Sequence, residues 1–110
     1  MAYDEHLADR IRALLEGEPR LTEKKMFGGL AFLIGGNMAV AASGQGGLLV
    51  RADPESSDTL LSTSVRPMEM RGKQMHGWLR VDTEAVRTKR QLKKWVRVGA
   101  AYARSLPSKR

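Results

Sequence analysis

The sequence predicts an α+β domain built as a two-layer sandwich, in which helices pack against a mainly antiparallel sheet of about five to six strands. Three observations predict this fold: a helical apolar pattern at each end of the chain, glycine-punctuated apolar runs between them, and a length of 110 residues. A chain of this length folds as one domain and buries roughly two thirds of its unfolded surface. We therefore expect residues 1–110 to form a single domain in the order helix, four strands, helix, two strands, helix.

The first helix is predicted from Asp4 to about Glu16. Asp4 suits the N-cap, because its carboxylate can accept a hydrogen bond from a free backbone N–H of the first turn. Gly17 and Pro19 follow the helix, as is typical after a helix end. The apolar positions of this segment recur with helical spacing and form one stripe, made of Leu7, Ile11, Leu14 and Leu15.

Four strands are predicted in the next thirty residues, where short apolar runs are separated by glycine. Gly35-Gly36-Asn37 lies between two such runs, and these residues accept the positive φ of a tight hairpin turn. Gly28-Gly29 lies inside an apolar run, where glycine usually marks a bulge or a close approach of two backbones. The four predicted strands are Thr22–Phe27, Leu30–Ile34, Met38–Ala42 and Gly47–Arg51.

The second half of the chain predicts a short helix and two further strands. Asp53 as N-cap and Pro54 at the first helical position favour a helix that ends near Leu61. A polar loop that contains Gly72 and Gly77 joins the two strands, and a helical turn follows at residues 83–87. The predicted strands are Val65–Met70 and Trp78–Val81.

The longest helix is predicted to begin after Thr88 and to end near Leu106. Thr88 and Gln91 fit the capping-box pattern, and Pro107 ends the helix. An apolar stripe predicts its core-facing side: Leu92, Trp95, Val96, Gly99, Tyr102, Ala103 and Leu106. The opposite side is cationic and carries Arg90, Lys93, Lys94, Arg97 and Arg104.

The cationic helix face has two interpretations. Charge runs usually only solvate a surface, and Asp82 and Glu84 lie close enough in sequence to neutralise part of it. Alternatively, the face binds anions, because like charges four residues apart, such as Lys93 and Arg97, repel each other and give no structural benefit. The charge distribution fits either interpretation: residues 66–110 hold thirteen Lys/Arg against three Asp/Glu, whereas residues 1–65 hold six against nine.

Composition and motifs exclude several classes of function. The chain has no cysteine, which removes disulfides, zinc–thiolate sites and thiol catalysis. We expect a cytoplasmic protein, because the N-terminus lacks the apolar core of a signal peptide and no run is long enough to span a membrane. No P-loop, dinucleotide fingerprint or nucleophile elbow is present. His6 and His76 are the only histidines. We therefore expect no enzyme activity, no metal and no cofactor.

Methionine is concentrated in the predicted sheet. The expected role is to fill an irregular core between sheet and helices, for which flexible thioether side chains are suited. The alternative is an adaptable apolar patch for a partner or for self-association across an exposed sheet edge. The residues concerned are Met26, Met38, Met68, Met70 and Met75.

Two short motifs resemble the N-terminal domain of TfoX/Sxy, bacterial regulators of competence. They are Met26-Phe27-Gly28-Gly29, followed by a strand and a glycine turn, and Met75-x-Gly77-Trp78 before the terminal helix. The resemblance extends from the first helix to about Leu106 and implies an α+β sandwich. Because the chain ends at Arg110, we expect a stand-alone domain without the C-terminal domain of the competence regulators.

The resemblance implies a small regulatory or adaptor protein without catalytic residues. Our leading hypothesis is a non-enzymatic module that binds a protein partner, in transcriptional regulation, with a homodimer as a further option. The alternative is direct, weakly specific nucleic-acid binding through the cationic helix face. A third interpretation is an enzyme with a small-molecule pocket near Gly28-Gly29 and Met75–Trp78.

Overall fold

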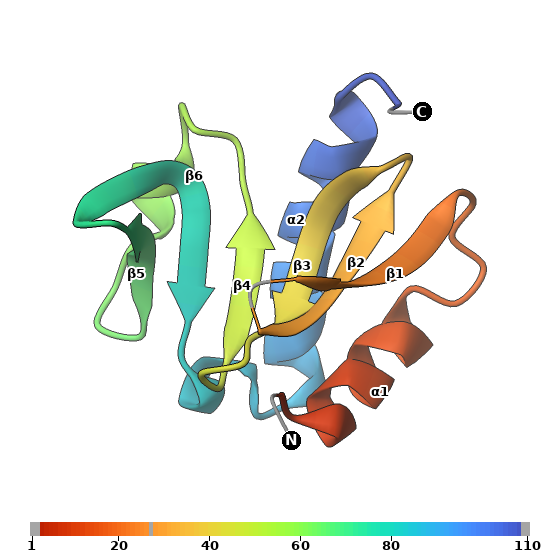
Figure 1. Ribbon diagram of the computed structural model, residues 1–110. Coiled ribbons are helices and arrows are strands. Elements are labelled where there is room, and N and C mark those ends of the chain that lie inside the picture. The colour runs from red at the N-terminus through yellow and green to blue at the C-terminus, as the bar shows by residue number, and fades with distance from the viewer. Residues whose placement is uncertain (1–2, 27, 109–110) are drawn as a thin grey trace.

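A computed structural model describes residues 3–26 and 28–108 of the chain, with helices stacked on one face of a sheet (Figure 1). The elements are α1 (Glu5–Leu14), β1 (Leu21–Met26), β2 (Gly29–Ile34), β3 (Asn37–Ala42), β4 (Leu48–Arg51), the 3₁₀ turn η1 (Ser57–Leu60), β5 (Val65–Met70), β6 (Lys73–Val81), the 3₁₀ turn η2 (Thr83–Val86) and α2 (Lys89–Ser105). The six strands of the described residues form one antiparallel sheet in the order β1-β2-β3-β4-β6-β5. The predicted α+β class and the order of elements are confirmed.

Glycine pairs bend the chain between neighbouring strands, as the sequence predicts. Gly35 and Gly36 have φ of 61° and 84°, and they join β2 to β3 as a two-residue turn between paired Ile34 and Asn37. Two successive positive φ angles are the requirement of the type I′ hairpin turn. Gly29 lies against β3, where a Cβ atom would stand 1.9 Å from the carbonyl oxygen of Ala42. The glycines of this region therefore serve backbone geometry.

The hairpin of β5 and β6 differs from the prediction. Strand β6 begins at Lys73 and not at Trp78, because Arg71 and Gly72 form a tight turn with φ of 55° and 80°. The extra residues are mostly exposed on both sides, so they lack the apolar alternation by which a strand is recognised. Gly77 lies within β6 at φ 83°, and its carbonyl oxygen accepts a hydrogen bond from the Ala52 amide at 2.7 Å.

The prediction of a short helix from Asp53 to about Leu61 is also wrong, because the helical segment there is shorter. Only the 3₁₀ turn η1 forms there, and the Asp53 carboxylate instead accepts a hydrogen bond from the Glu55 amide at 2.9 Å. This local side-chain-to-backbone bond holds a turn and competes with helix formation. The helical turn predicted at residues 83–87 is confirmed as η2.

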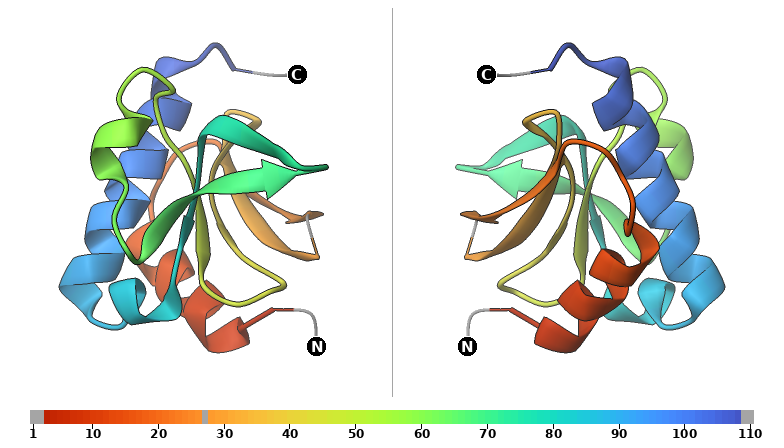
Figure 2. Two further views of the ribbon diagram at one scale, coloured as in Figure 1. Left: turned by 90° about the vertical axis from the view of Figure 1, so that its left-hand side faces the viewer. Right: turned by 90° about the vertical axis from the view of Figure 1, so that its right-hand side faces the viewer.

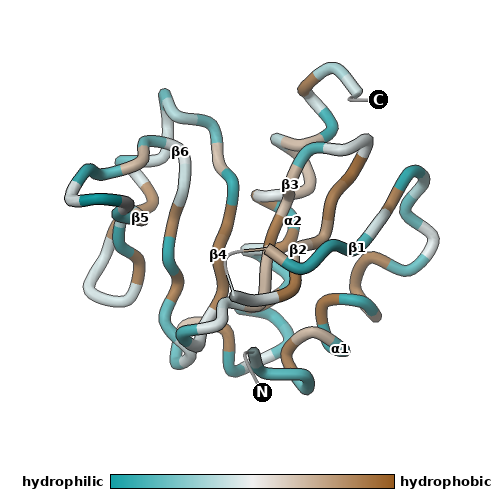
Figure 3. Tube along the Cα trace, viewed as in Figure 1, coloured by the Kyte–Doolittle hydropathy of each residue, from teal (hydrophilic) through white to brown (hydrophobic). Residues whose placement is uncertain are grey.

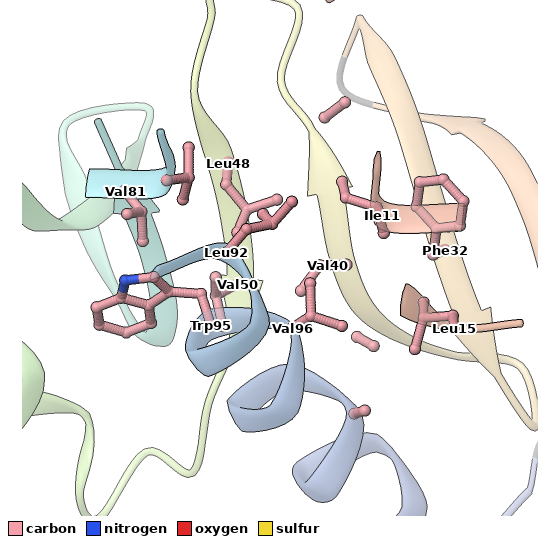
Figure 4. Close-up of a cluster of buried hydrophobic side chains, with 14 of the residues drawn as sticks. Ile11, Leu15, Phe32, Val40, Leu48, Val50, Val81, Leu92, Trp95 and Val96 are labelled. Carbon is pink, nitrogen blue, oxygen red and sulfur yellow. The ribbon is translucent and has the colours of Figure 1, made fainter. Parts of the chain in front are cut away.

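The main hydrophobic core lies between the sheet and the two helices (Figure 4). Trp95 and Val96 of α2 pack over β3 and β4, while Ile11 and Leu15 approach Phe32 from the side of α1. The apolar stripe predicted on α2 is confirmed for its buried members, and Tyr102 and Leu106 are half-buried at its border. The Thr88–Gln91 capping box is present in full.

A second, smaller apolar cluster lies on the other face of the sheet. Its buried members are Ala31, Met38, Ala41, Leu49 and Met68. Among the described residues no helix covers this face, and β1 and the β5–β6 hairpin reach outward on this side (Figure 2). The expectation that methionine fills the core between sheet and helices is therefore wrong for Met38 and Met68, which are buried on the opposite face. Met70 belongs to β5, but its side chain is outside the described part.

Candidate functional site

The face of the sheet that turns away from α1 and α2 is named the open face. Side chains alternate along each strand, so Leu48 and Val50 of β4 enter the main core whereas Leu49 belongs to the cluster on the open face. Arg51, two residues further, points to the same face and pairs with Trp78 of β6. Figure 3 shows the hydrophobic centre of the sheet between the more hydrophilic β1 and the β5–β6 hairpin.

A groove of about 720 Å³ lies on the open face, and it is named the open groove. Its apolar strand residues come from β1, β2, β3 and β6. The three residues that follow α2 line one end of the groove. Among the described lining residues, Lys24 and Arg51 are the charged ones, and both are cationic. The described lining is Lys24, Met26, Leu33, Gly36, Asn37, Met38, Arg51, Trp78, Leu106, Pro107 and Ser108.

Arg51 is the best-positioned polar group of the open groove. Its guanidinium carbon lies 4.5 Å from the ring centroid of Trp78 and 5.4 Å from that of Tyr102. Arginine stacks in this way through the flat faces of its guanidinium group, which leaves the N–H groups at its edges for acceptors. No acidic side chain of the described residues forms an ion pair with Arg51 or Lys24.

One end of the open groove is fixed by polar contacts to the segment after α2. The amide nitrogen Nδ2 of buried Asn37 donates to the carbonyl oxygen of Pro107 at 2.9 Å. The Arg20 guanidinium donates to Ser108 Oγ, and Gly35 lies so close that a Cβ atom there would meet the same oxygen at 2.8 Å. The β2–β3 turn and the residues after α2 therefore hold each other in place.

A second hollow of about 640 Å³ lies beside the open groove and has a different chemistry. It contains Glu69 together with Arg66 and Arg80, and both of these arginines have partners. Arg66 forms an ion pair with Asp82 at 2.6 Å, and Arg80 donates to Ser43 Oγ at 3.3 Å. The open groove thus combines an apolar floor with cations that lack an acidic partner among the described residues. The second hollow contains both signs of charge, and its two arginines already have hydrogen-bonding partners.

The cationic face predicted on α2 is exposed. Arg90, Lys93, Lys94 and Arg97 are exposed, and the Lys94 ammonium lies 5.0 Å from the Trp95 ring centroid. The two acids expected to neutralise this face contact other groups. Asp82 pairs with Arg66, and Glu84 accepts a hydrogen bond from Ser64.

Arg104 differs from the other cations of this face. Its guanidinium forms two hydrogen bonds to the carboxylate of Glu18, which follows α1, and the Nε–Oε2 distance is 3.1 Å. This contact lowers the pKa of Glu18 and raises the pKa of Arg104, because each charge is stabilised by its hydrogen-bonded partner. Arg104 therefore links α2 to the segment after α1 and has an acidic partner, unlike Arg90, Lys93, Lys94 and Arg97 among the described residues.

Comparison with known proteins gives one match. The family model of the TfoX N-terminal domain matches residues 13–103, which is most of the chain. The chain belongs to the TfoX N-terminal domain family. No curated protein and no solved structure matches it. Membership of this family suggests a regulatory or adaptor module.

The two motifs that carry the family resemblance meet in this TfoX N-terminal domain. Met26 and Trp78 both line the open groove, although one lies on β1 and the other on β6. Met75 packs against the apolar cluster of the open face. The glycine positions Gly28, Gly29 and Gly77 shape backbone turns and close approaches, and Phe27 is outside the described residues.

We searched the described part of this TfoX N-terminal domain for side chains that could act in catalysis or bind a metal ion. His6 and His76 are both exposed, and no group of three or more metal-binding side chains gathers in residues 3–26 and 28–108. The described lining of the open groove contains no carboxylate and no histidine. Within the same residues, no helix has the length and hydropathy needed to cross a membrane.

Sequence reasoning missed Arg51, although two of its alternatives, the methionine patch and the pocket near Met75–Trp78, include Met26, Met38 and Trp78, which line the open groove. Arg51 ends an apolar strand, and a charged residue at a strand end is an ordinary surface position. The pairing of Arg51 with Trp78 depends on β4 lying next to β6 with β5 outside, a crossover that no local pattern reveals. The available signal was the motif tryptophan itself, the one aromatic ring besides His76 in the described β5–β6 hairpin.

Proposed function

We propose that this domain is a non-enzymatic, cytoplasmic bacterial module that binds a protein partner through the open groove, in transcriptional regulation. The supporting observation is the groove itself: an apolar floor of methionine, leucine and tryptophan beside unpaired cations, on a face that no described helix covers. Methionine, tryptophan and arginine are enriched in the centres of protein interfaces. Flexible methionine side chains also adapt to the shape of a partner.

The edges of the sheet favour docking on the face over addition of a partner strand. The edge strand β1 carries three consecutive charged residues, Glu23, Lys24 and Lys25, all exposed. The other edge strand, β5, contains Pro67, with a register irregularity directly after it. Charges, proline and bulges protect edge strands against pairing with another chain. These features argue against a homodimer formed by edge pairing and favour the open face as the docking surface.

Site-specific photo-crosslinking in living bacteria tests the proposal, because the chain offers two matched exposed lysines. Lys24 lies at the open groove and Lys94 on the cationic face of α2. A photoreactive amino acid at position 24 should give discrete adducts with a protein, and these adducts should survive nuclease. The same amino acid at position 94 should not give them. Adducts from position 94 alone, or adducts that disappear with nuclease, would contradict the proposal.

Nucleic-acid binding through α2 remains a second candidate, favoured by one observation. Arg90, Lys93, Lys94 and Arg97 are exposed along one helix and form no ion pair within the described residues. Such a face would contact phosphates and would read little sequence. Binding to a duplex oligonucleotide should then weaken steeply with salt, because each phosphate contact releases condensed counterions.

A charge-matched pair of variants tests this second candidate. Replacement of Lys93, Lys94 and Arg97 by glutamine should abolish oligonucleotide binding and leave the fold intact. Replacement of Lys25, Arg71 and Lys73 by glutamine removes the same charge from the β1–β2 and β5–β6 hairpins and should have little effect on oligonucleotide binding. Equal losses in the two triple variants would indicate a nonspecific response to net charge, and no binding by the parent domain would remove the candidate.

A further inference from the structure

We infer that the open groove binds an acidic peptide segment, with a carboxylate against Arg51 and Lys24 and an apolar side chain on the methionine floor. This inference rests on the proposed function and adds the chemical class of the partner. Three features of the groove support it: the sign of its charge, the orientation of its arginine and the character of its floor.

The charge of the groove favours an anionic partner. Lys24 and Arg51 are the charged residues of its described lining, and no described acid pairs with either. The neighbouring hollow differs, since Arg66 there is already neutralised by Asp82. A carboxylate that enters the open groove therefore does not have to displace an internal partner. Complementary charge of this kind sets partner choice and speeds association.

The stacking of Arg51 prepares it for a carboxylate. Trp78 and Tyr102 contact the guanidinium through ring faces, at 4.5 and 5.4 Å from its carbon, and so restrict its orientation. The N–H groups at the guanidinium edges remain available, and two of them match the two oxygens of a carboxylate. Because the arginine is half-buried and stacked on two rings, its binding to a carboxylate should cost less side-chain entropy than that of a fully exposed arginine.

The floor of the groove favours a peptide over a nucleic acid. Met26, Leu33 and Met38 present apolar surface that suits an aliphatic or aromatic side chain. The volume of about 720 Å³ accommodates a few side chains. A nucleic acid would require a longer track of cations, and two cations in this lining do not form one. An acidic residue close to an apolar anchor supplies both parts of the complement.

A peptide library tests the inference with defined probes. Phage that display random peptides of about a dozen residues, long enough for one recognition segment, are selected on the intact 110-residue domain. Enriched peptides should combine Asp or Glu with a neighbouring apolar residue. A fluorescent copy of an enriched peptide should bind the parent domain, and Arg51→Met should weaken its binding by about tenfold or more. Lys24→Met should weaken it less, and the matched control Lys94→Met should leave it unchanged.

The methionine methyl groups give a second measurement that does not depend on the arginine variant. With ¹³C-methyl methionine, the peptide should shift the NMR signals of Met26 and Met38, both of which line the groove. If Arg51→Met fails to fold, as judged by circular dichroism, the inference is tested by peptide binding to Lys24→Met and by the shifts of the Met26 and Met38 signals in the parent domain.

Several outcomes would overturn the inference. They are an absence of enriched peptides, enrichment without acidic residues, or binding that neither moves the two methionine signals nor responds to Lys24→Met. Displacement of the peptide by an oligonucleotide would assign the groove to nucleic acid, and self-association lost in Lys24→Met would assign it to a second copy of the chain. Failure here together with protein adducts from position 24 would leave the proposed function standing. Failure of both the peptide selection and the crosslinking at position 24 would contradict both the inference and the proposed function.

Discussion

The two faces of the sheet bury apolar side chains in different ways. The face under the helices is built from bulky residues such as Phe32, Val40 and Leu79, each at most 1% exposed. The open face is also buried at its centre, but Ala31 and Ala41 occupy that centre while Met38 and Met68 lie around it. A face covered by a helix packs against a fixed shape, whereas the open face, within residues 3–26 and 28–108, is covered by its own side chains and not by a helix. Burial alone therefore does not distinguish a stabilising core from a binding surface.

The largest loss of stability is expected on the covered face. Phe32→Ala should lower the free energy of unfolding by about 3 to 5 kcal/mol, because the ring is fully buried between β2 and α1 and its removal leaves a cavity. Urea denaturation followed by circular dichroism measures this change. A loss below about 1 kcal/mol would mean that the covered face is as adaptable as the open one.

A smaller loss is expected where α2 contacts the sheet most closely. A Cβ atom at Gly99 would lie 2.2 Å from the Ala39 carbonyl oxygen, so Gly99→Ala must push the helix away from β3. We expect a loss of about 1 to 3 kcal/mol from overpacking, although alanine is intrinsically the better helix former. Ala101→Ser, an exposed control on the same helix, should change stability by less than about 0.5 kcal/mol. A stabilised Gly99→Ala variant would show that the two layers can separate freely.

On the open face, a change of shape should cost less. Met38→Leu keeps nearly the same volume, and its neighbours are flexible, so the expected loss is below about 1.5 kcal/mol. The same variant should weaken binding of an enriched acidic peptide, because leucine adapts less well than methionine. Thermal unfolding and fluorescence anisotropy measure the two effects. A strong loss of stability without a change in binding would reverse the roles assigned to the two faces.

The smallest effect is expected at the end of the helical layer. Glu18→Gln removes a partly exposed ion pair with Arg104 and should cost about 0.2 to 1 kcal/mol near neutral pH. Because the pKa of Glu18 is lowered in the folded state, its contribution is present above its ordinary pKa of about 4.5 and is lost as pH falls through the lowered value. The variant should therefore lose less stability on acidification than the parent. Identical acid profiles would show that the pair contributes nothing.

Much of the fold could be predicted because its signals are local. The Gly35-Gly36 turn, the capping box of α2 and the helical spacing of Trp95 and Val96 each depend on a few neighbouring residues. The start of β6 at Lys73 escaped prediction because that part of the hairpin is solvated on both sides and has no apolar alternation.

The site could not be predicted because its parts meet only through packing. Strand alternation shows that two faces exist, but the positions of α1 and α2 decide which face stays open. A helical projection places Arg104 among free cations and cannot show that Glu18 lies opposite it after the turn from α1. Arg51 and Trp78 become neighbours only when the register between β4 and β6 is known.

The position of α2 after all six strands has a consequence for synthesis on the ribosome. Every strand emerges before the segment that shields Val50 and its neighbours on β3 and β4, so this part of the nascent sheet exposes its apolar side chains until Trp95 and Val96 have left the exit tunnel. Unfinished chains of this kind are the natural clients of chaperones. We expect a chain stalled with residues up to Thr88 outside the tunnel to be aggregation-prone and bound by chaperones, and emergence of α2 from the tunnel to release it.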